Sequence, residues 1–134
     1  MSSPAHPLRL YKKEKLCSEI AIARVFNRAD PATSSASAYP LAASWQLNGT
    51  RVIKCPRFLA SIPKKRVRHA VDRVGLRRRV REAYRLHRDL IPADRPLDIV
   101  FVYIGKTPMP YAAIEKSMMR LLDRINKFLA DNEQ

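Results

Sequence analysis

The segment Lys64–Arg88, KKRVRHAVDRVGLRRRVREAYRLHR, holds eleven Lys and Arg residues against two acidic residues, Asp72 and Glu82. Side chains of like charge repel one another, so a folded domain that concentrates them needs a partner or solvent to offset the repulsion. A polyanion is the partner that would best offset this concentration of positive charge. The segment therefore raises the question of which polyanion it contacts.

The same segment has the periodicity of an amphipathic helix. An arginine at every fourth residue projects guanidinium groups along one side of a helix at about 6 Å per step. The fork of donors on each guanidinium matches two phosphate oxygens. We interpret the arginine face as a surface that follows a nucleic-acid backbone. The apolar face holds Leu76, Val80, Ala83, Tyr84 and Leu86 or His87, and the arginine face holds Arg73, Arg77, Arg81, Arg85 and Arg88.

Three other interpretations of the basic helix fit less well. A solvated face supported by acid–base pairs would need more acids than Asp72 and Glu82. A helix lying on a membrane would need a wider apolar face. A DNA-reading helix usually interleaves Asn, Gln, Ser or Thr with its arginines, and this segment contains none of them. Recognition of backbone and shape, which is typical of structured RNA, fits best.

The whole chain is short, basic and globular in composition. Its 134 residues carry a net charge of +14, and 46% of them are hydrophobic, which predicts one folded domain rather than a disordered chain. Residues 1–13 suggest a flexible basic arm and residues 14–134 a single domain. We expect a cytoplasmic protein, because no apolar run is long enough to span a membrane or to form a signal peptide. Cys17 and Cys55 are expected to be reduced thiols.

Around the basic helix, the sequence predicts an α+β fold. We expect a first helix over Glu14–Arg28, a strand over Tyr39–Leu47, and a return strand to Pro63 that is broken near Pro56. Asn48-Gly49 favours a hairpin between these two strands. Residues 33–37 are either a flexible connection or a weak edge strand. LDIVFVYI, Leu97–Ile104, is typical of a buried strand, and residues 110–130 have the period of a last helix.

Two of these helices have predicted core positions. In the first helix the apolar stripe is Leu16, Ile20, Ala23 and Phe26 or Asn27, widened by Ile22 and Val25. In the last helix it is Ile114, Met118, Leu121, Leu122, Ile125 and Leu129.

The sequence shows no pattern for catalysis by the polypeptide. The acids are scattered without a carboxylate pair of the kind that holds two metal ions. His69 and His87 lie eighteen residues apart, which is about five helical turns, so they cannot flank one scissile bond. No glycine-rich phosphate loop is present. Five aromatic residues could stack on unpaired bases, although from their residue type we expect each of them to be a core residue: Phe26, Tyr39, Trp45, Phe58 and Tyr84.

The segment PKKRVRHAVDRVGLRRRVREAYRLHR, residues 63–88, resembles the most characteristic segment of the bacterial ribonuclease P protein subunit. In that family a Lys-Lys/Arg pair leads through Ala-Val into an Arg-Asn-Arg core, then basic residues and Arg-Glu-Ala-aromatic-Arg. The matching positions are Lys64, Lys65 and Arg66, then Ala70, Val71 and Arg73, then Arg77, Arg78, Arg81, Glu82, Ala83, Tyr84 and Arg85. The remaining elements repeat the family's order over nearly the whole chain.

The resemblance implies a fold and an activity. The fold would be a small two-layer α/β sandwich of order α-β-β-β-α-β-α, similar to ribosomal protein S5 domain 2. The activity would be that of a protein subunit, a monomer within a ribonucleoprotein, which assists a catalytic RNA in removing the 5′ leader of precursor tRNA. The RNA would perform the hydrolysis with Mg²⁺, and the protein would bind no cofactor and carry no catalytic residue.

The resemblance also implies which residues bind. A leader cleft would use Phe26 and Tyr39. The contacts to RNA phosphates would come from Lys64, Lys65, Arg66, Arg68, Arg73, Arg77, Arg78, Arg81 and Arg85.

The chain departs from the family pattern where Arg73-Val74-Gly75 replaces Arg-Asn-Arg. The change removes a guanidinium and an amide, and it puts a glycine inside a helix at a cost of about 1 kcal/mol relative to alanine. We expect weaker RNA binding as a result. Two rival functions remain open at this point. One is a ribosomal-type protein that binds structured RNA without a role in tRNA processing, and the other is a protein-only nuclease.

Overall fold

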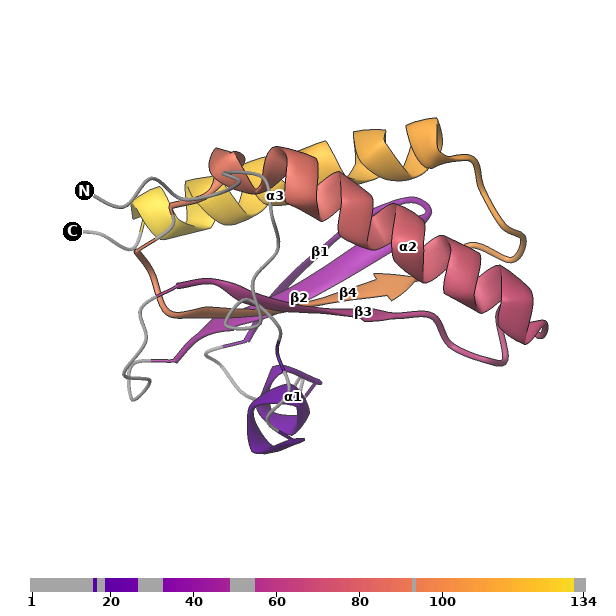
Figure 1. Ribbon diagram of the computed structural model, residues 1–134. Coiled ribbons are helices and arrows are strands. Elements are labelled where there is room, and N and C mark those ends of the chain that lie inside the picture. The colour runs from indigo at the N-terminus through magenta and orange to yellow at the C-terminus, as the bar shows by residue number, and fades with distance from the viewer. Residues whose placement is uncertain (1–15, 17–18, 27–32, 49–54, 93, 132–134) are drawn as a thin grey trace, which may run out of the picture.

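The computed structural model describes residues 16, 19–26, 33–48, 55–92 and 94–131. These residues form a four-stranded sheet with two long helices on one face and a short helix on the other (Figure 1). The expected α+β class and element order are confirmed, and the alternative strand near residues 33–37 is present. The elements are α1 (Glu19–Phe26), β1 (Ser34–Ala38), β2 (Leu41–Leu47), β3 (Arg57–Ser61), α2 (Ala70–His87), the 3₁₀ helix η2 (Arg88–Leu90), β4 (Leu97–Tyr103) and α3 (Tyr111–Asp131).

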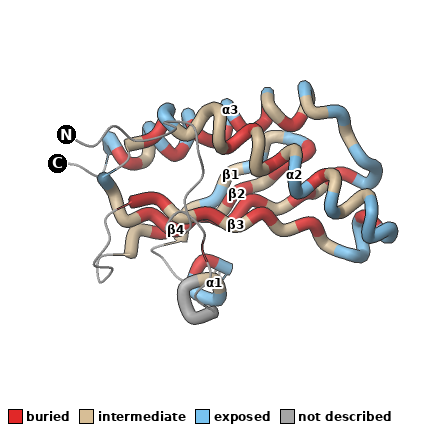
Figure 2. The backbone as a smooth tube through the Cα atoms, in the orientation of Figure 1, coloured by how far each residue is buried: buried red, intermediate tan, exposed pale blue. Residues whose placement is uncertain are grey.

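Strand β4 is the centre of the sheet, whose strand order among the described residues is β1-β2-β4-β3. It pairs antiparallel with β2 on one side and parallel with β3 on the other. Every residue of β4 except Val102 is buried (Figure 2). Because both faces of β4 are covered, its sequence is almost continuously apolar rather than alternating. The prediction of a buried strand over Leu97–Ile104 is confirmed.

The predicted hairpin at Asn48-Gly49 is wrong. Strand β2 forms its hairpin with β1, through a turn at Tyr39-Pro40 whose peptide bond is cis, and β4 separates β2 from β3. The backbone N–H of Asn48 donates to the carbonyl of Pro96 at 2.7 Å. The Asn48 side chain donates to Asp98 of β4 at 3.2 Å. The polar groups of Asn48 therefore connect β2 to the start of β4. Gly49 lies outside the described residues.

Helix α1 covers a small second core on the opposite face of the sheet from α2 and α3. Its inward residues are Val25, which is fully buried, and the half-buried Ile22. They pack with Leu16 and with Val100 of β4. The predicted stripe through Ala23 and Phe26 is wrong, since both side chains are exposed. Ile22 and Val25, which were predicted to widen the stripe, lie on the buried side with the predicted Leu16. The side chain of Ile20 lies outside what the structure describes. Residues 14, 15, 17, 18, 27 and 28 of the predicted helix, and the arm over 1–13, lie outside the described residues.

Helices α2 and α3 pack side by side on the main core. All the apolar positions predicted for the last helix are buried, together with Ser117. In α2 the buried residues are Leu76, Val80, Ala83 and Tyr84, as expected from the spacing. The Ser117 hydroxyl has one proton, which it shares between the carbonyl of Tyr39 at 2.7 Å and that of Ala113 at 3.1 Å. The sheet and this helix pair form the two layers of the expected sandwich.

An aromatic cluster joins α2 to the sheet. The rings of Phe58 and Tyr84 stack with centroids 4.1 Å apart, and Phe101 contacts both at 6.4 and 5.8 Å. Phe58 is buried, so removing its ring leaves a cavity between β3 and α2.

We expect Phe58→Ala to lower the free energy of unfolding by about 3–5 kcal/mol, because transfer and cavity terms add in a buried site. Denaturant unfolding of wild type and variant measures the difference. The matched control is Phe26→Ala, whose ring is 47% exposed and whose loss should change stability by about 0.5 kcal/mol or less. Equal effects at the two positions would contradict the assignment of the core.

The end of α2 is fixed to α3 by a polar contact. Nε2 of His87 lies 2.9 Å from Oε2 of Glu115, to which the Tyr111 hydroxyl also donates at 3.3 Å. The hydrogen bond from His87 lowers the pKa of the Glu115 carboxyl, against the opposing effect of desolvation. A carboxyl whose pKa is lower in the folded state stabilises the fold above its unfolded pKa, and this stabilisation disappears as the pH falls through the folded pKa.

We therefore expect Glu115→Gln to be less stable than wild type near neutral pH and equally stable in acid. Denaturant unfolding of both proteins from about pH 7 down to about pH 3 spans the ordinary carboxyl range. In a His87→Ala background the same substitution should have a much smaller effect. A constant difference between wild type and Glu115→Gln at every pH would refute the role of this contact.

Candidate nucleic-acid interface

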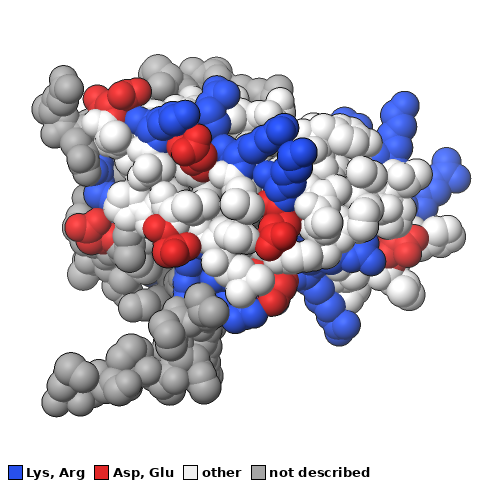
Figure 3. Space-filling view, turned by 90° about the horizontal axis from the view of Figure 1, so that it is seen from above, with Lys and Arg blue, Asp and Glu red and all other residues white. Residues whose placement is uncertain are grey.

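The basic face of α2 follows from how the helix packs. One side of α2 is held against the sheet by its apolar residues, so its arginines lie on the other sides of the helix. Seen from the side of α2 and α3, Lys and Arg side chains project from the right-hand end of the molecule (Figure 3). Figure 1 places the loops that follow β3 and β4 at that end. The cationic surface thus includes the outer side of α2 and the loop that leads into it.

The leading cluster of the predicted interface lies in the loop between β3 and α2. Lys64, Lys65, Arg66 and Arg68 are all exposed. Nη1 of Arg66 donates to the carbonyl of Ile104, beyond the end of β4, at 3.1 Å. Within the part of the chain that the structure describes, the two lysines and Arg68 show no side-chain hydrogen bond or ion pair. Three of these four cations are therefore available to an external anion.

The arginines on the first turns of α2 differ in their availability. Nη1 of Arg73 donates to the carbonyls of Val67 at 3.0 Å and Arg68 at 2.7 Å, so this guanidinium closes the loop that enters the helix. Arg77 and Arg78 are exposed and, among the described residues, have no side-chain partner. The sequence did not indicate that these arginines differ in this way. Arg73 is a structural donor, whereas Arg77 and Arg78 point to solvent.

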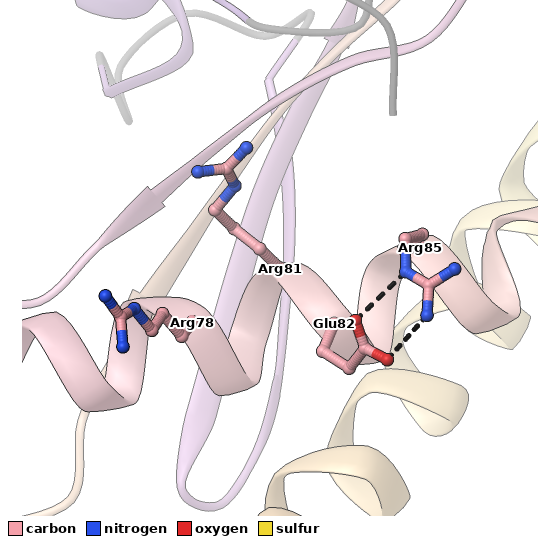
Figure 4. Close-up of a pocket in the computed structure, with 4 residues that line it drawn as sticks. All are labelled: Arg78, Arg81, Glu82 and Arg85. Atoms are coloured by element: carbon pink, nitrogen blue, oxygen red, sulfur yellow. Dashed lines mark hydrogen bonds and ion pairs between the residues drawn. The ribbon is translucent and has the colours of Figure 1, made fainter. Parts of the chain in front are cut away.

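A shallow pocket of about 260 Å³ lies along the middle of α2. Its lining residues are Arg78, Arg81, Glu82 and Arg85 (Figure 4). Glu82 accepts two hydrogen bonds from Arg85, at 3.0 Å from Nε and 2.6 Å from Nη2. The guanidiniums of Arg78 and Arg81 point away from this pair. Arg78 and Arg81 thus have no side-chain partner among the described residues, whereas Arg85 in the same pocket is paired with Glu82.

The Arg85–Glu82 pair changes the electrostatics of the basic face. The hydrogen bond from Arg85 holds the pKa of the Glu82 carboxyl below its ordinary value, although desolvation acts the other way. Glu82 in turn raises the pKa of Arg85. Both groups are therefore charged at neutral pH. The acids of the segment were expected to pair with few arginines, and Glu82 does pair with one of them.

The aromatic residues divide between core and surface. Trp45, Phe58 and Tyr84 are buried, as expected of core residues. The same expectation is wrong for Phe26 and Tyr39, whose side chains are 47% and 62% exposed. Phe26 ends α1 on one side of the sheet. Tyr39 lies in the β1–β2 turn, where its carbonyl is bound by Ser117 of α3. The two predicted leader residues are thus exposed rings carried by different elements.

Two basic residues near the interface were missed from the sequence. Nη1 of Arg79 donates to the carbonyl of Met109 at 2.8 Å and ties α2 to the loop between β4 and α3. Lys106 lies exposed in that same loop. A single lysine after a buried strand carries no pattern by itself. The signal that would have revealed it is the parallel pairing of β3 and β4, which brings the loops after both strands to one edge.

The altered positions of the family core both face outward. The Val74 side chain is 44% exposed. A Cβ atom added at Gly75 would meet no atom within 4 Å outside the backbone of its own helix. Neither position therefore needs its present residue for packing. The absence of the amide and guanidinium at 74 and 75 therefore changes the surface chemistry of α2 and its helix propensity, but not the packing of the core.

Metal and membrane features are absent from the described part of the chain. Among those residues, no group of three or more His, Cys, Asp and Glu could hold a metal ion. No described helix is long and apolar enough to cross a membrane. The Cys55 side chain is buried; Cys17 lies outside the described residues.

Comparison with known proteins agrees with the geometry. The family model described as Ribonuclease P matches residues 10–126. The chain is 32% identical over 130 residues to the ribonuclease P protein component of Porphyromonas gingivalis, which covers 93% of this chain and 91% of that protein. The RNase P protein of Staphylococcus aureus, solved at 2.0 Å, shares the fold with a TM-score of 0.67 at 20% identity, over 84% of this chain and 94% of that one.

The RNase P protein from Thermotoga maritima has the same fold, with a TM-score of 0.66 at 22% identity over 83% of this chain and 96% of that one. At 20% and 22% identity the two solved structures show the fold alone. The family match and the relative from Porphyromonas gingivalis show to which family the chain belongs. The chain belongs to the ribonuclease P protein family.

Proposed function

We propose that this protein is the protein subunit of a ribonuclease P ribonucleoprotein, in which it binds a catalytic RNA and its precursor tRNA and assists removal of the 5′ leader. The observation that carries the proposal is the outer surface of α2 with its entry loop. That surface presents Arg77, Arg78 and Arg81 without internal partners among the described residues. A rigid row of unpaired guanidiniums matches an RNA backbone.

In this proposal the polypeptide contributes binding and charge rather than chemistry. The RNA holds Mg²⁺ and hydrolyses the phosphodiester, and no described cluster of the protein has the donors for a metal of its own. Cations of α2 lie between crowded phosphates, where they replace condensed counterions and lower the magnesium concentration that assembly requires. The protein would act as a monomer in the cytoplasm.

Leader binding is the second part of the proposal. Phe26 and Tyr39 expose rings that an unpaired base can stack on, and stacking does not depend on base identity. Such contacts would add affinity for a single-stranded leader of any sequence. The main rival is a general binder of structured RNA, which would use the same arginines but would not alter the cleavage of precursor tRNA.

We expect the protein to stimulate multiple-turnover cleavage of precursor tRNA by a bacterial ribonuclease P RNA at low magnesium. The Arg78→Gln, Arg81→Gln double variant should lose about tenfold or more in affinity for that RNA and show a shallower salt dependence, because each phosphate contact contributes to the slope. The matched control is Arg120→Gln, Arg124→Gln, which removes two exposed arginines from α3.

The control should retain nearly all the stimulation. If wild type binds RNA without stimulating cleavage, the general RNA-binding function replaces the proposal. If both double variants lose affinity equally, net charge rather than the surface of α2 determines binding.

We expect the Val74→Asn, Gly75→Arg variant to bind the catalytic RNA about fivefold or more tightly than wild type, since it adds one guanidinium and one amide to an open surface. Gly75→Ala is the control. It gains up to about 1 kcal/mol of helix stability and adds no contact to RNA. Filter binding at several salt concentrations distinguishes them. A gain in affinity shared by Gly75→Ala would assign the effect to helix stability instead.

A further inference from the structure

The loops that follow β3 and β4 meet at one edge of the sheet. These two strands are parallel, with Ser61 opposite Val102, so their carboxyl ends emerge on the same side. Open α/β sheets commonly bind ligands outside the carboxyl ends of their strands. At this edge Lys65, Arg66 and Lys106 line an open pocket of about 440 Å³, a volume within the roughly 300–1,000 Å³ of small-molecule sites.

The loop that carries Lys106 is held in place by its neighbours. Gly105 lies against the ring of Tyr103, and a Cβ atom at this glycine would come within 2.9 Å of the ring. Hydrogen bonds fix the loop on either side of Lys106, so the lysine stands on a preorganised backbone. They run from the Ile104 N–H to the Pro40 carbonyl at 2.8 Å, from Arg66 to the Ile104 carbonyl at 3.1 Å, from the Tyr103 hydroxyl to the Thr107 carbonyl, and from Arg79 to the Met109 carbonyl at 2.8 Å.

Among the described residues, the lining of the pocket carries positive charge alone. The three described lining residues are all cationic. Lys65 and Lys106 are exposed and have no side-chain partner among the described residues. Arg66 gives one donor to Ile104, and a guanidinium has five. Holding three cations around one hollow raises the energy of the free protein, and an anion in the hollow removes that repulsion.

We infer that Lys65, Arg66 and Lys106 form a discrete site for a phosphodiester of RNA, separate from the arginine row of α2, and that Lys106 is an RNA-binding residue. The inference rests on the proposed function for the identity of the polyanion. Arg66 recognises the phosphate through its remaining donors and the two lysines neutralise it. Because Lys65 and Arg66 belong to the loop that enters α2, the site extends the path of the bound backbone beyond the helix.

The first test compares Lys106→Gln with Lys127→Gln. Both remove one exposed lysine, but Lys127 lies at the far end of α3 beside Asp123. We expect Lys106→Gln to weaken binding to a bacterial ribonuclease P RNA by about fivefold and to reduce the slope of log affinity against log salt by about one. Lys127→Gln should leave the slope unchanged. Equal losses in the two variants, with thermal unfolding unaltered, would overturn the inference.

A second measurement asks whether the lysines share one phosphate. Lys65→Gln, Lys106→Gln and the double variant form a cycle in binding affinity. Residues that hold one ligand group give a double variant whose loss differs from the sum of the single losses, whereas independent sites add. Strict additivity would overturn the single-phosphate site.

Two RNA sources could supply the phosphate, and separate titrations distinguish them. One arm measures binding of the protein to the catalytic RNA alone, and the other measures binding of the assembled ribonucleoprotein to precursor tRNA. The site is supported if Lys106→Gln alters either arm more than Lys127→Gln does. If wild type fails to stimulate cleavage while Lys106 still determines the salt slope, the proposed function fails and the phosphate site stands. If cleavage is stimulated and Lys106→Gln behaves like Lys127→Gln in both arms, the site alone fails.

Discussion

The rest of the structure depends on β4, the central strand of the sheet, which neighbouring elements surround. Both of its edges are paired and both of its faces are covered, one by the helix pair and the other by α1. Leu97, Ile99, Phe101 and Tyr103 face the main core, while Val100 and Val102 face the small one. Because β3 joins β4 in parallel, the chain must cross over the sheet between them, and α2 is that crossover. The position of the basic helix thus follows from the parallel pairing of β3 with a buried, largely apolar strand.

Helix α2 packs against the sheet and also presents cations to solvent, and it uses different sides for the two. Its apolar side is held by the stacked Phe58 and Tyr84 rings, so the helix does not need its charged side for stability. Two of its arginines nevertheless work inside the fold, since Arg73 and Arg79 bind backbone carbonyls of the neighbouring loops. The remaining cations project from a support that these contacts keep rigid. A row of charge on such a helix binds with little loss of conformational entropy.

The sequence predicted the parts of the fold that local patterns determine. Period and composition sufficed for α2, α3 and β4, because each of them buries one continuous apolar stripe or run. The pairing of strands could not be predicted, because Asn48-Gly49 carries a hairpin signal whose polar groups serve β4 instead. For the candidate site, periodicity placed Arg77 on the outward face, and the family resemblance indicated Arg78. The hydrogen bonds of Arg73 to the carbonyls of Val67 and Arg68 depend on how the chain turns into α2, and the position of Lys106 depends on the pairing of β3 with β4. Helical periodicity contains neither.

The contact between Glu82 and Arg85 determines which anion an RNA phosphate would displace when it binds to this helix. Arg85 already holds a carboxylate of its own chain, supplied three residues away at a very high effective concentration. An RNA phosphate that reaches Arg85 displaces that tethered carboxylate, whereas one that reaches Arg78 displaces mobile ions. The first exchange releases no salt ion to the solution, and it leaves Glu82 facing the bound phosphate. In the proposed complex Glu82 would therefore compete with a phosphate for Arg85, which favours contacts at Arg78 and Arg81 over a contact at Arg85.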